Sequence, residues 1–267
     1  MTSKENLPRL RIATWNVNSI RARRERLLRW LEREAVDVLC LQELKVSDEE
    51  FPALDLQALG YHSAVFGQKT YNGVAILARE RPRDVERGFG APDGEEDEQA
   101  RLIAGTVAGV RVLCAYFPNG GSLGSEKWSY KLSWMTRLRA HLDRRYDPDQ
   151  PLALCGDFNV APEARDVHDP AVWEGSVLFH PEARAALRDV AGFGLEDVVR
   201  RHHEEGGLFS WWDYRMLAFP KGRGLRIDHI YTTRTLADRS RDAFIDRDER
   251  KGELPSDHAP VVASFAA

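Results

Sequence analysis

The sequence is poor in cysteine and has no long apolar run. Its 267 residues include three cysteines, Cys40, Cys114 and Cys155, each within a short apolar stretch and none in a zinc-type pair. An odd number of cysteines in such surroundings predicts buried free thiols rather than a disulfide framework. No stretch approaches the roughly 20 apolar residues of a membrane helix, and the first residues lack the apolar core of a secretion signal. We therefore expect a cytoplasmic protein with no membrane association.

Positive charge is not in excess either. The chain has 38 Lys and Arg against 42 Asp and Glu, a formal net charge of −4. Any contact with a polyanion must therefore come from a local basic patch. The sequence also contains no Gly-rich phosphate loop of the nucleotide-binding type, which excludes that way of holding a phosphate.

Short apolar runs alternate with amphipathic stretches along the chain. Seven runs are typical of strands covered on both faces: 10–15, 36–42, 73–77, 110–116, 152–155, 227–232 and 260–265. The stretches 21–34 and 131–146 predict helices that pack on sheets. Residues 88–98, rich in Gly and acidic residues, predict a surface loop. Because no linker composition divides the chain, we expect one layered α/β domain over 1–267, with 1–9 as a flexible tail.

Polar side chains stand where these apolar runs stop. They are Asn16, Asn18, Glu43, Tyr116, Asn119, Asp157, Asn159, Asp228, Asp257 and His258. Each one alone has an ordinary explanation, because Asp and Asn often end strands by satisfying turn backbone. The loops at one end of the sheet form the site in layered α/β proteins, so the set as a whole predicts convergence.

The residue types in this set indicate phosphoryl chemistry with a hard metal. Oxygen atoms of Glu43, Asp257 and Asn16 suit Mg²⁺ or Mn²⁺, and no Cys/His cluster favours zinc. A Lewis acid on a phosphate oxygen, a base for water and donors for developing charge are what phosphoryl hydrolysis requires. Asp228 could orient His258 and leave an imidazolium facing the phosphate. The Ser-Asp-His run that ends at His258 is a poor serine-hydrolase triad, because adjacent residues rarely share a hydrogen-bonded relay.

These residues belong to a series of eight short sequence motifs that follow one another along the chain. They are WNVNSIRAR (15–23), LQELK (41–45), GQKTYNGVA (67–75), YFPNG (116–120), GDFNVAP (156–162), FSWWDYR (209–215), GLRID (224–228) and PSDHAP (255–260). This series resembles the motif set of the exonuclease III family, within the endonuclease/exonuclease/phosphatase superfamily. The resemblance implies a four-layer α/β/β/α sandwich with two packed mixed β-sheets. It also implies a divalent-metal-dependent DNA-repair nuclease.

The implied reactions are cleavage of phosphodiesters 5′ to abasic sites, 3′–5′ exonuclease action and 3′-phosphatase or phosphodiesterase action on duplex DNA. The implied ligands of Mg²⁺, for which Mn²⁺ can substitute, are Asn16, Glu43 and Asp257. The implied catalytic residues are Tyr116, Asp157, Asn159, Asp228 and His258. Whether Asp157, Tyr116 or the pair of His258 and Asp228 acts as the base stays open.

Contacts with DNA are implied at Asn18, Arg21, Tyr71, Arg101 and Asn119. Trp211, Leu225 and Ile227 are expected to line a narrow apolar pocket, which admits an abasic sugar and excludes a whole nucleotide. Plain core packing is the alternative for these three. Ser122 stands where vertebrate-type relatives present a wedge arginine, so the balance between abasic incision and exonuclease action is open. Asn18 stands where some relatives carry Asp.

The expected partner is double-stranded DNA with abasic sites or blocked 3′ ends, bound by a monomer. Two rival functions are a phosphatase for small or lipid phosphates and a non-catalytic RNA-binding regulator with the same fold. The strings at 209–215 and 224–228 argue against the phosphatase. The complete set of metal and histidine positions argues against the regulator, because function depends on the site rather than the fold.

Overall fold

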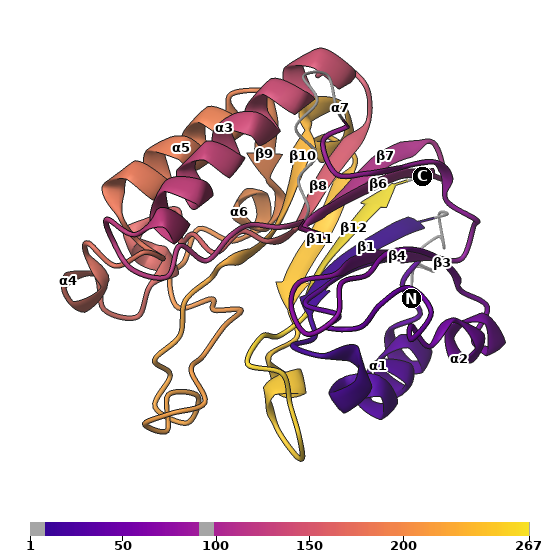
Figure 1. Cartoon of the computed structure of the whole chain (residues 1–267), viewed down its shortest axis with the longest axis horizontal. Helices are drawn as coiled ribbons and strands as arrows, with labels where there is room; N and C mark the ends of the chain where they lie inside the picture. Colours follow the sequence, from indigo (N-terminus) through magenta and orange to yellow (C-terminus); the bar gives the residue numbers. More distant parts are fainter. Residues whose placement is uncertain (1–8, 91–98, 267) are drawn as a thin grey trace, which may run out of the picture.

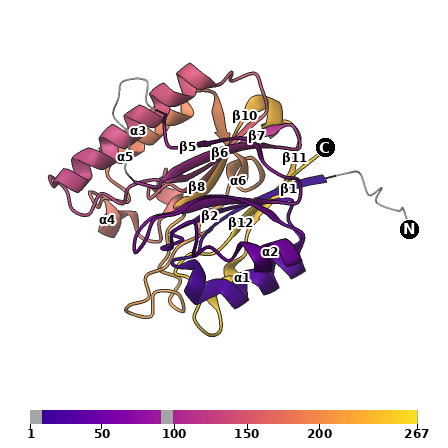
Figure 2. The ribbon, with the colours of Figure 1, turned by 45° about the vertical axis from the view of Figure 1, so that its right-hand side comes forward.

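Two six-stranded sheets pack face to face, and helices cover both outer faces (Figure 1). The structure, a computed structural model, describes residues 9–90 and 99–266. Figure 2 shows α1 and α2 on one side of the paired sheets and α3 and α5 on the other. This arrangement is the expected four-layer α/β/β/α sandwich.

The first sheet has the strand order β11-β12-β1-β2-β4-β3. Its strands are β1 (Arg9–Asn16), β2 (Val38–Gln42), β3 (His62–Phe66), β4 (Val74–Ala78), β11 (Ser240–Ile245) and β12 (Val261–Ala266). β1 and β2 run parallel, and the other neighbours run antiparallel. The parallel pair ends with Asn16 opposite Gln42.

The second sheet repeats this plan with the order β5-β6-β7-β8-β10-β9. Its strands are β5 (Arg83–Arg87), β6 (Leu102–Val107), β7 (Val110–Tyr116), β8 (Leu152–Asp157), β9 (Leu195–Asp197) and β10 (Asp228–Thr233). β7 and β8 are parallel and end with Tyr116 opposite Asp157. Antiparallel β10 begins with Asp228, also opposite Asp157, so three polar side chains meet at one sheet edge.

The two longest helices begin after serines that satisfy free backbone N–H groups. The Ser19 and Ser125 hydroxyls accept from backbone N–H groups in the first turns of α1 (Ile20–Glu34) and α3 (Glu126–Arg145). The other helices are α2 (Ala53–Ala58), α4 (Pro170–Trp173), α5 (Pro181–Ala191), α6 (Val198–His202) and α7 (Arg234–Ala237). Two 3₁₀ turns cover Ala164–Asp166 and Arg247–Arg250. None of the helices within 9–90 and 99–266 is long and apolar enough to cross a membrane.

Three apolar clusters hold the layers together. One fills the space between the sheets and contains Ile12 and Val38 from the first sheet and Val112 and Ile230 from the second. A second lies between the first sheet and α1, and a third lies between the second sheet and α3 and α5. All three cysteines are buried and free, as predicted.

The predicted strands and helices are present, with changed boundaries. The helix expected over 131–146 begins earlier, at Glu126, because Ser125 caps it. Arg9, expected in a flexible tail, is the first residue of β1 and pairs with Ala266. Residues 1–8 of that expected tail and 91–98 of the expected loop lie outside the described residues.

Candidate active site

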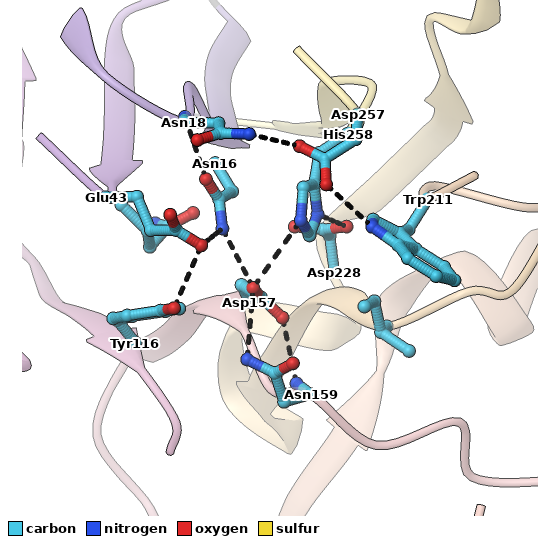
Figure 3. Close-up of polar contacts among 12 residues, drawn as sticks. Asn16, Asn18, Glu43, Tyr116, Asp157, Asn159, Trp211, Asp228, Asp257 and His258 are labelled. Carbon is cyan, nitrogen blue, oxygen red and sulfur yellow. Dashed lines mark hydrogen bonds and ion pairs between the residues drawn. The ribbon is translucent and has the colours of Figure 1, made fainter. Parts of the chain in front are cut away.

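The polar residues from the strand ends come together at the edge where both parallel pairs finish (Figure 3). Asp157 lies at the centre of the group. Its Oδ2 accepts hydrogen bonds from Asn16 Nδ2 at 2.9 Å and Asn159 Nδ2 at 3.2 Å, and its Oδ1 accepts from the Asn159 backbone N–H at 2.9 Å. Burial raises the pKa of Asp157 to about 7, although the nearby His258 opposes the rise. A carboxyl with this pKa exchanges its proton near neutral pH.

His258 lies between two carboxylates. Its Nδ1 is 2.8 Å from Asp228 Oδ2, and its Nε2 is 3.8 Å from Asp157 Oδ2. Burial by itself would lower the pKa of His258, but Asp228, Asp157 and Asp257 outweigh it and raise the pKa to about 10. The ring is therefore an imidazolium at neutral pH that donates Nδ1–H to Asp228 and presents Nε2–H to the site.

Glu43 is held by three donors. Its Oε1 accepts from Asn16 Nδ2 and from the Tyr116 hydroxyl, both at 2.9 Å, and its Oε2 lies 2.8 Å from Lys45 Nζ. Burial alone would raise the pKa of Glu43, but Lys45 and Asn16 outweigh it and the pKa lies below its usual value. The Glu43 carboxylate is therefore ionised at neutral pH.

Several of these groups fit a divalent cation. Ligand atoms of Glu43, Asp157 and His258 all lie within 4.8 Å of one another. A protonated imidazole has no free lone pair for a metal, so His258 is unsuited as a ligand in its charged form. Two carboxylates remain, with the Asn16 side chain beside them. Hard oxygen donors of this kind suit Mg²⁺ and Mn²⁺.

Two of the predicted metal ligands have other partners in the structure. Asn16 turns its Nδ2 toward the carboxylates, and its Oδ1 accepts from the Asn18 backbone N–H at 3.0 Å. Asp257 accepts from Asn18 Nδ2 at 2.9 Å and from Trp211 Nε1 at 3.0 Å. Its carboxylate is not part of the group formed by Glu43 and its neighbours. Metal ligation by Asn16 and Asp257 stays a prediction.

Three of the predicted DNA contacts surround one cavity beside the site. Tyr71, Arg101 and Asn119 line a space of about 540 Å³ that Tyr116 also borders. The Arg101 guanidinium lies 4.8 Å from the centre of the Tyr116 ring, and the Asn119 amide donates to Asn159 Oδ1 at 3.0 Å. This cavity therefore adjoins the group of strand-end residues at Tyr116.

The other two predicted DNA contacts, Asn18 and Arg21, do not line this cavity. Asn18 joins Asp257 and accepts from Lys45 Nζ at 2.5 Å. Arg21 is exposed on α1 and forms an ion pair with Glu50. Contact of these residues with DNA stays a prediction.

The residues expected to form the abasic pocket pack together, but they differ in burial. Leu225 is 0% exposed and Ile227 is 1% exposed, within an apolar cluster that also contains Phe179. Trp211 is only partly buried against that cluster. The rings of Trp173 and Trp211 pack edge to face, with their centres 6.1 Å apart. Trp211 is therefore the member of the three that an incoming sugar can reach.

The sequence interpretation missed two lysines. Lys45 contacts both Glu43 and Asn18, and its place two residues after Glu43 in the LQELK string was a usable signal. Lys131 is completely buried on α3, on the same side of the helix as the buried Met135 and Leu138. Lys131 lies four residues before Met135 and seven before Leu138, so a count at helical spacing would have put it on the buried stripe.

The fold and this site define a hydrolase of phosphate esters, because buried carboxylates, an imidazolium and a phenol converge at the edge of a four-layer sandwich. The sequence profile of the Endonuclease/Exonuclease/phosphatase family matches residues 13–258. The chain belongs to this family.

Several known proteins are similar to this chain over nearly its whole length. Exodeoxyribonuclease III of Haemophilus influenzae is 37% identical, with 96% of this chain and 100% of that protein covered. An AP endonuclease from Archaeoglobus fulgidus has a TM-score of 0.93 and 42% identity, with 97% of this chain and 100% of that one covered. The 3′-5′ exonuclease from Neisseria meningitidis has a TM-score of 0.91 and 41% identity, over 97% and 100% of the two chains.

Proposed function

We propose that the protein is a DNA-repair nuclease that cuts the phosphodiester 5′ to abasic sites and removes phosphates and nucleotides from 3′ ends. The observation that carries this function is the group of Glu43, Asp157 and His258, whose ligand atoms lie within 4.8 Å of one another. The relatives named exodeoxyribonuclease III and AP endonuclease support DNA as the substrate.

The proposed reaction needs a divalent cation. We expect this cation to be Mg²⁺, for which Mn²⁺ can substitute. Glu43 would hold it, with the side chains of Asn16 and Asp257 as further candidates. When bound, the cation supplies a Lewis acid for a phosphate oxygen. The Asn16 Nδ2 donates to Glu43 and to Asp157, both at 2.9 Å. A rotation of this amide group would instead turn its oxygen toward the cation.

Asp157 is the base that takes the proton from the attacking water. Its pKa of about 7 lets it be ionised at neutral pH and still accept a proton. His258, with a pKa of about 10, is already protonated and donates from Nε2 to a phosphate oxygen. Burial and the nearby carboxylates raise the pKa of Tyr116 well above its usual value, so its phenol is a donor rather than a base.

Duplex DNA lies across the edge that carries the cavity and Trp211. Arg101 supplies positive charge beside the site, and the Asn119 amide offers a donor to the phosphate, while Asn159 holds the Asp157 carboxylate. Because the site takes Asn16 and Glu43 from one sheet and Asp157 from the other, we propose that 1–267 acts as a single domain. A monomer carries the complete set of groups, and we expect it in the cytoplasm.

Processing of 3′ ends is the second candidate for the dominant activity. Ser122 occupies the place of a wedge arginine, and Leu123 beside it is 46% exposed. Another Neisseria structure with 41% identity is described as a 3′ phosphatase bound to a product DNA hairpin. Without a wedge, holding the duplex open depends on other residues, whereas a 3′ terminus reaches the site without an extruded sugar.

The test is a fluorescent duplex with one abasic site, incubated with and without Mg²⁺, beside a duplex of the same sequence with a 3′-phosphate. We expect cleavage 5′ to the abasic site only with metal, and release of phosphate under the same conditions. An inositol phosphate and an intact single-stranded RNA serve as controls for the rival functions. Turnover of inositol phosphate without cleavage of DNA would contradict the proposal.

A further inference from the structure

Lys131 is a buried charge that lies outside the reacting groups and contacts the loops that carry them. It faces the second sheet from the second turn of α3, and it is 0% exposed. Its Nζ donates to the backbone carbonyl oxygens of Asn119 at 3.0 Å, Asn159 at 2.7 Å and Val177 at 2.7 Å. An ammonium has three protons, and these three acceptors use all of them.

The acceptors belong to three separate loops. Asn119 follows β7, Asn159 follows β8, and Val177 lies between α4 and α5. The Asn119 and Asn159 side chains are joined at 3.0 Å, and Asn159 donates twice to the Asp157 carboxylate. A continuous series of hydrogen bonds therefore runs from Lys131 through Asn159 to the central carboxylate.

Stability alone does not explain a lysine at this position. Its neighbours on the same face of α3 are Trp128, Trp134, Met135 and Leu138, all buried, so an apolar residue would continue the stripe. Burying an ammonium costs free energy that its hydrogen bonds must offset. Burial lowers the pKa of Lys131 to about 7, with only the charge of Asp157 acting against it. A lysine at this position therefore carries a cost in stability, which indicates a use for its hydrogen bonds to the three carbonyl groups.

We propose that Lys131 is a positioning residue that fixes the loops of Asn119 and Asn159 and thereby orients the Asp157 carboxylate for the reaction. The inference deepens the proposed nuclease function and rests on it. A neutral side chain at 131 would leave three carbonyl groups without a donor and allow the loops to shift. Misplacement of a reacting group by about 1 Å can cost roughly 100-fold in rate.

The experiment compares Lys131→Met, which keeps the length and removes the charge, with Lys131→Arg, which keeps charge and donors. We expect kcat for abasic incision to fall by about 10- to 100-fold in Lys131→Met, as for other supporting residues of catalytic sites. KM should stay within about threefold, because loss of orientation acts on the transition state rather than on DNA binding. Lys131→Arg should recover a large part of kcat.

The matched control is His141→Leu. His141 is also buried on α3, but it bonds to the Phe89 carbonyl oxygen at 3.1 Å and not to the loops of the site. This variant should change the melting temperature and leave kcat unchanged.

A double variant tests whether Lys131 acts through Asn159. In that case the losses of kcat in Lys131→Met and Asn159→Ala should be far from additive when the two substitutions are combined.

An unchanged kcat in folded Lys131→Met, or additive losses with Asn159→Ala, would overturn the inference. Equal losses of kcat in His141→Leu would overturn it as well, by revealing a general effect of α3. Should Lys131→Met not fold, Lys131→Gln is measured in its place against the same expectation. An inactive wild type in Mg²⁺ would instead contradict the proposed function, which separates the two failures.

Discussion

The proposed catalytic group, which contains Asp157, Asp228 and His258, is buried, whereas the tip of the segment 211–227 is exposed. Asp157, Asp228 and His258 are at most 4% exposed, and each bonds to another member of the group. The tip of the segment is open, with Met216 75% exposed and Leu217 65% exposed. Fixed groups in a dry surrounding act strongly on developing charge, whereas a surface that meets DNA must be accessible. If the proposed roles are right, chemistry and recognition are therefore carried by separate regions.

The two regions meet around Trp211. Trp211 donates its indole N–H to Asp257 at 3.0 Å, and Asp257 precedes His258 in the chain. The Trp211 backbone also forms bridges with Leu225 and His258. Substitutions on the two sides of this contact should therefore give different patterns of loss across substrates, and four experiments test that separation.

Removal of the metal should have the largest effect. EDTA should abolish cleavage of every substrate, and Mg²⁺ or Mn²⁺ should restore it, because carboxylates would otherwise repel the phosphate. Glu43→Ala should raise the Mg²⁺ concentration needed for half-maximal rate at least as much as it lowers turnover. Glu50→Ala, an exposed carboxylate paired with Arg21, is the control. Full turnover in EDTA, or an unchanged Mg²⁺ titration for Glu43→Ala, would remove these groups from the metal site.

Loss of the base or of the imidazolium should come next. Asp157→Asn and His258→Ala should each lower kcat by roughly 10²- to 10⁴-fold, the usual contribution of a positioned acid or base. Binding of DNA, measured by fluorescence anisotropy, should remain within a few-fold of wild type, because both residues act mainly on the transition state. A loss of DNA affinity as large as the loss of kcat would place them in recognition instead.

The rate should follow a bell-shaped pH profile. Asp157 has a raised pKa of about 7 and must be ionised to act, so kcat/KM should rise with pH through that value. His258 has a pKa of about 10 and must be protonated, so the rate should fall above it. From pH 7 to pH 5 the loss should be about 50-fold, because about half of the Asp157 carboxyl groups are ionised at pH 7 and about 1% at pH 5.

The profile is measured at low and high Mg²⁺, with thermal melting at each pH to separate unfolding from titration. More Mg²⁺ should move the acidic limb to lower pH, because a cation favours the carboxylate form. A flat profile between pH 5 and 8 at low Mg²⁺ would exclude Asp157 as the base.

Trp211→Ala should give the smallest loss and the one that depends most on the substrate. Truncation of an aromatic that packs on the sugar should cost about 1–3 kcal/mol in abasic incision, by analogy with stacking on bases. Removal of a 3′-phosphate should change less, since it needs the catalytic group but little of the pocket.

Trp211→Phe keeps the ring and removes the N–H that bonds to Asp257, so it separates packing from the hydrogen bond. Rates on both substrates and melting temperatures are compared for the two variants. Equal losses on both substrates together with a lowered melting temperature would show that Trp211 is a core residue.

The sequence by itself determined the layered α/β class and the resemblance to a nuclease family. Local periodicity identified the central strands, because strands covered on both faces have nearly continuous apolar runs. It missed the edge strands β3, β5, β9 and β11, which are short or partly exposed, and one inner strand, β6. Short or exposed strands lack the apolar signal on which such a prediction depends.

Which side chains meet was decided by the tertiary structure. Asn16 and Asp157 are 141 positions apart, and they touch because the two parallel strand pairs end at the same edge of the packed sheets. The pKa values of Asp157 and His258 follow from burial and mutual charge, neither of which is a property of the local sequence. Lys131 shows the same limit most clearly. Its residue type suggests an exposed helix position, and only the packing of α3 on three loops makes it a buried donor.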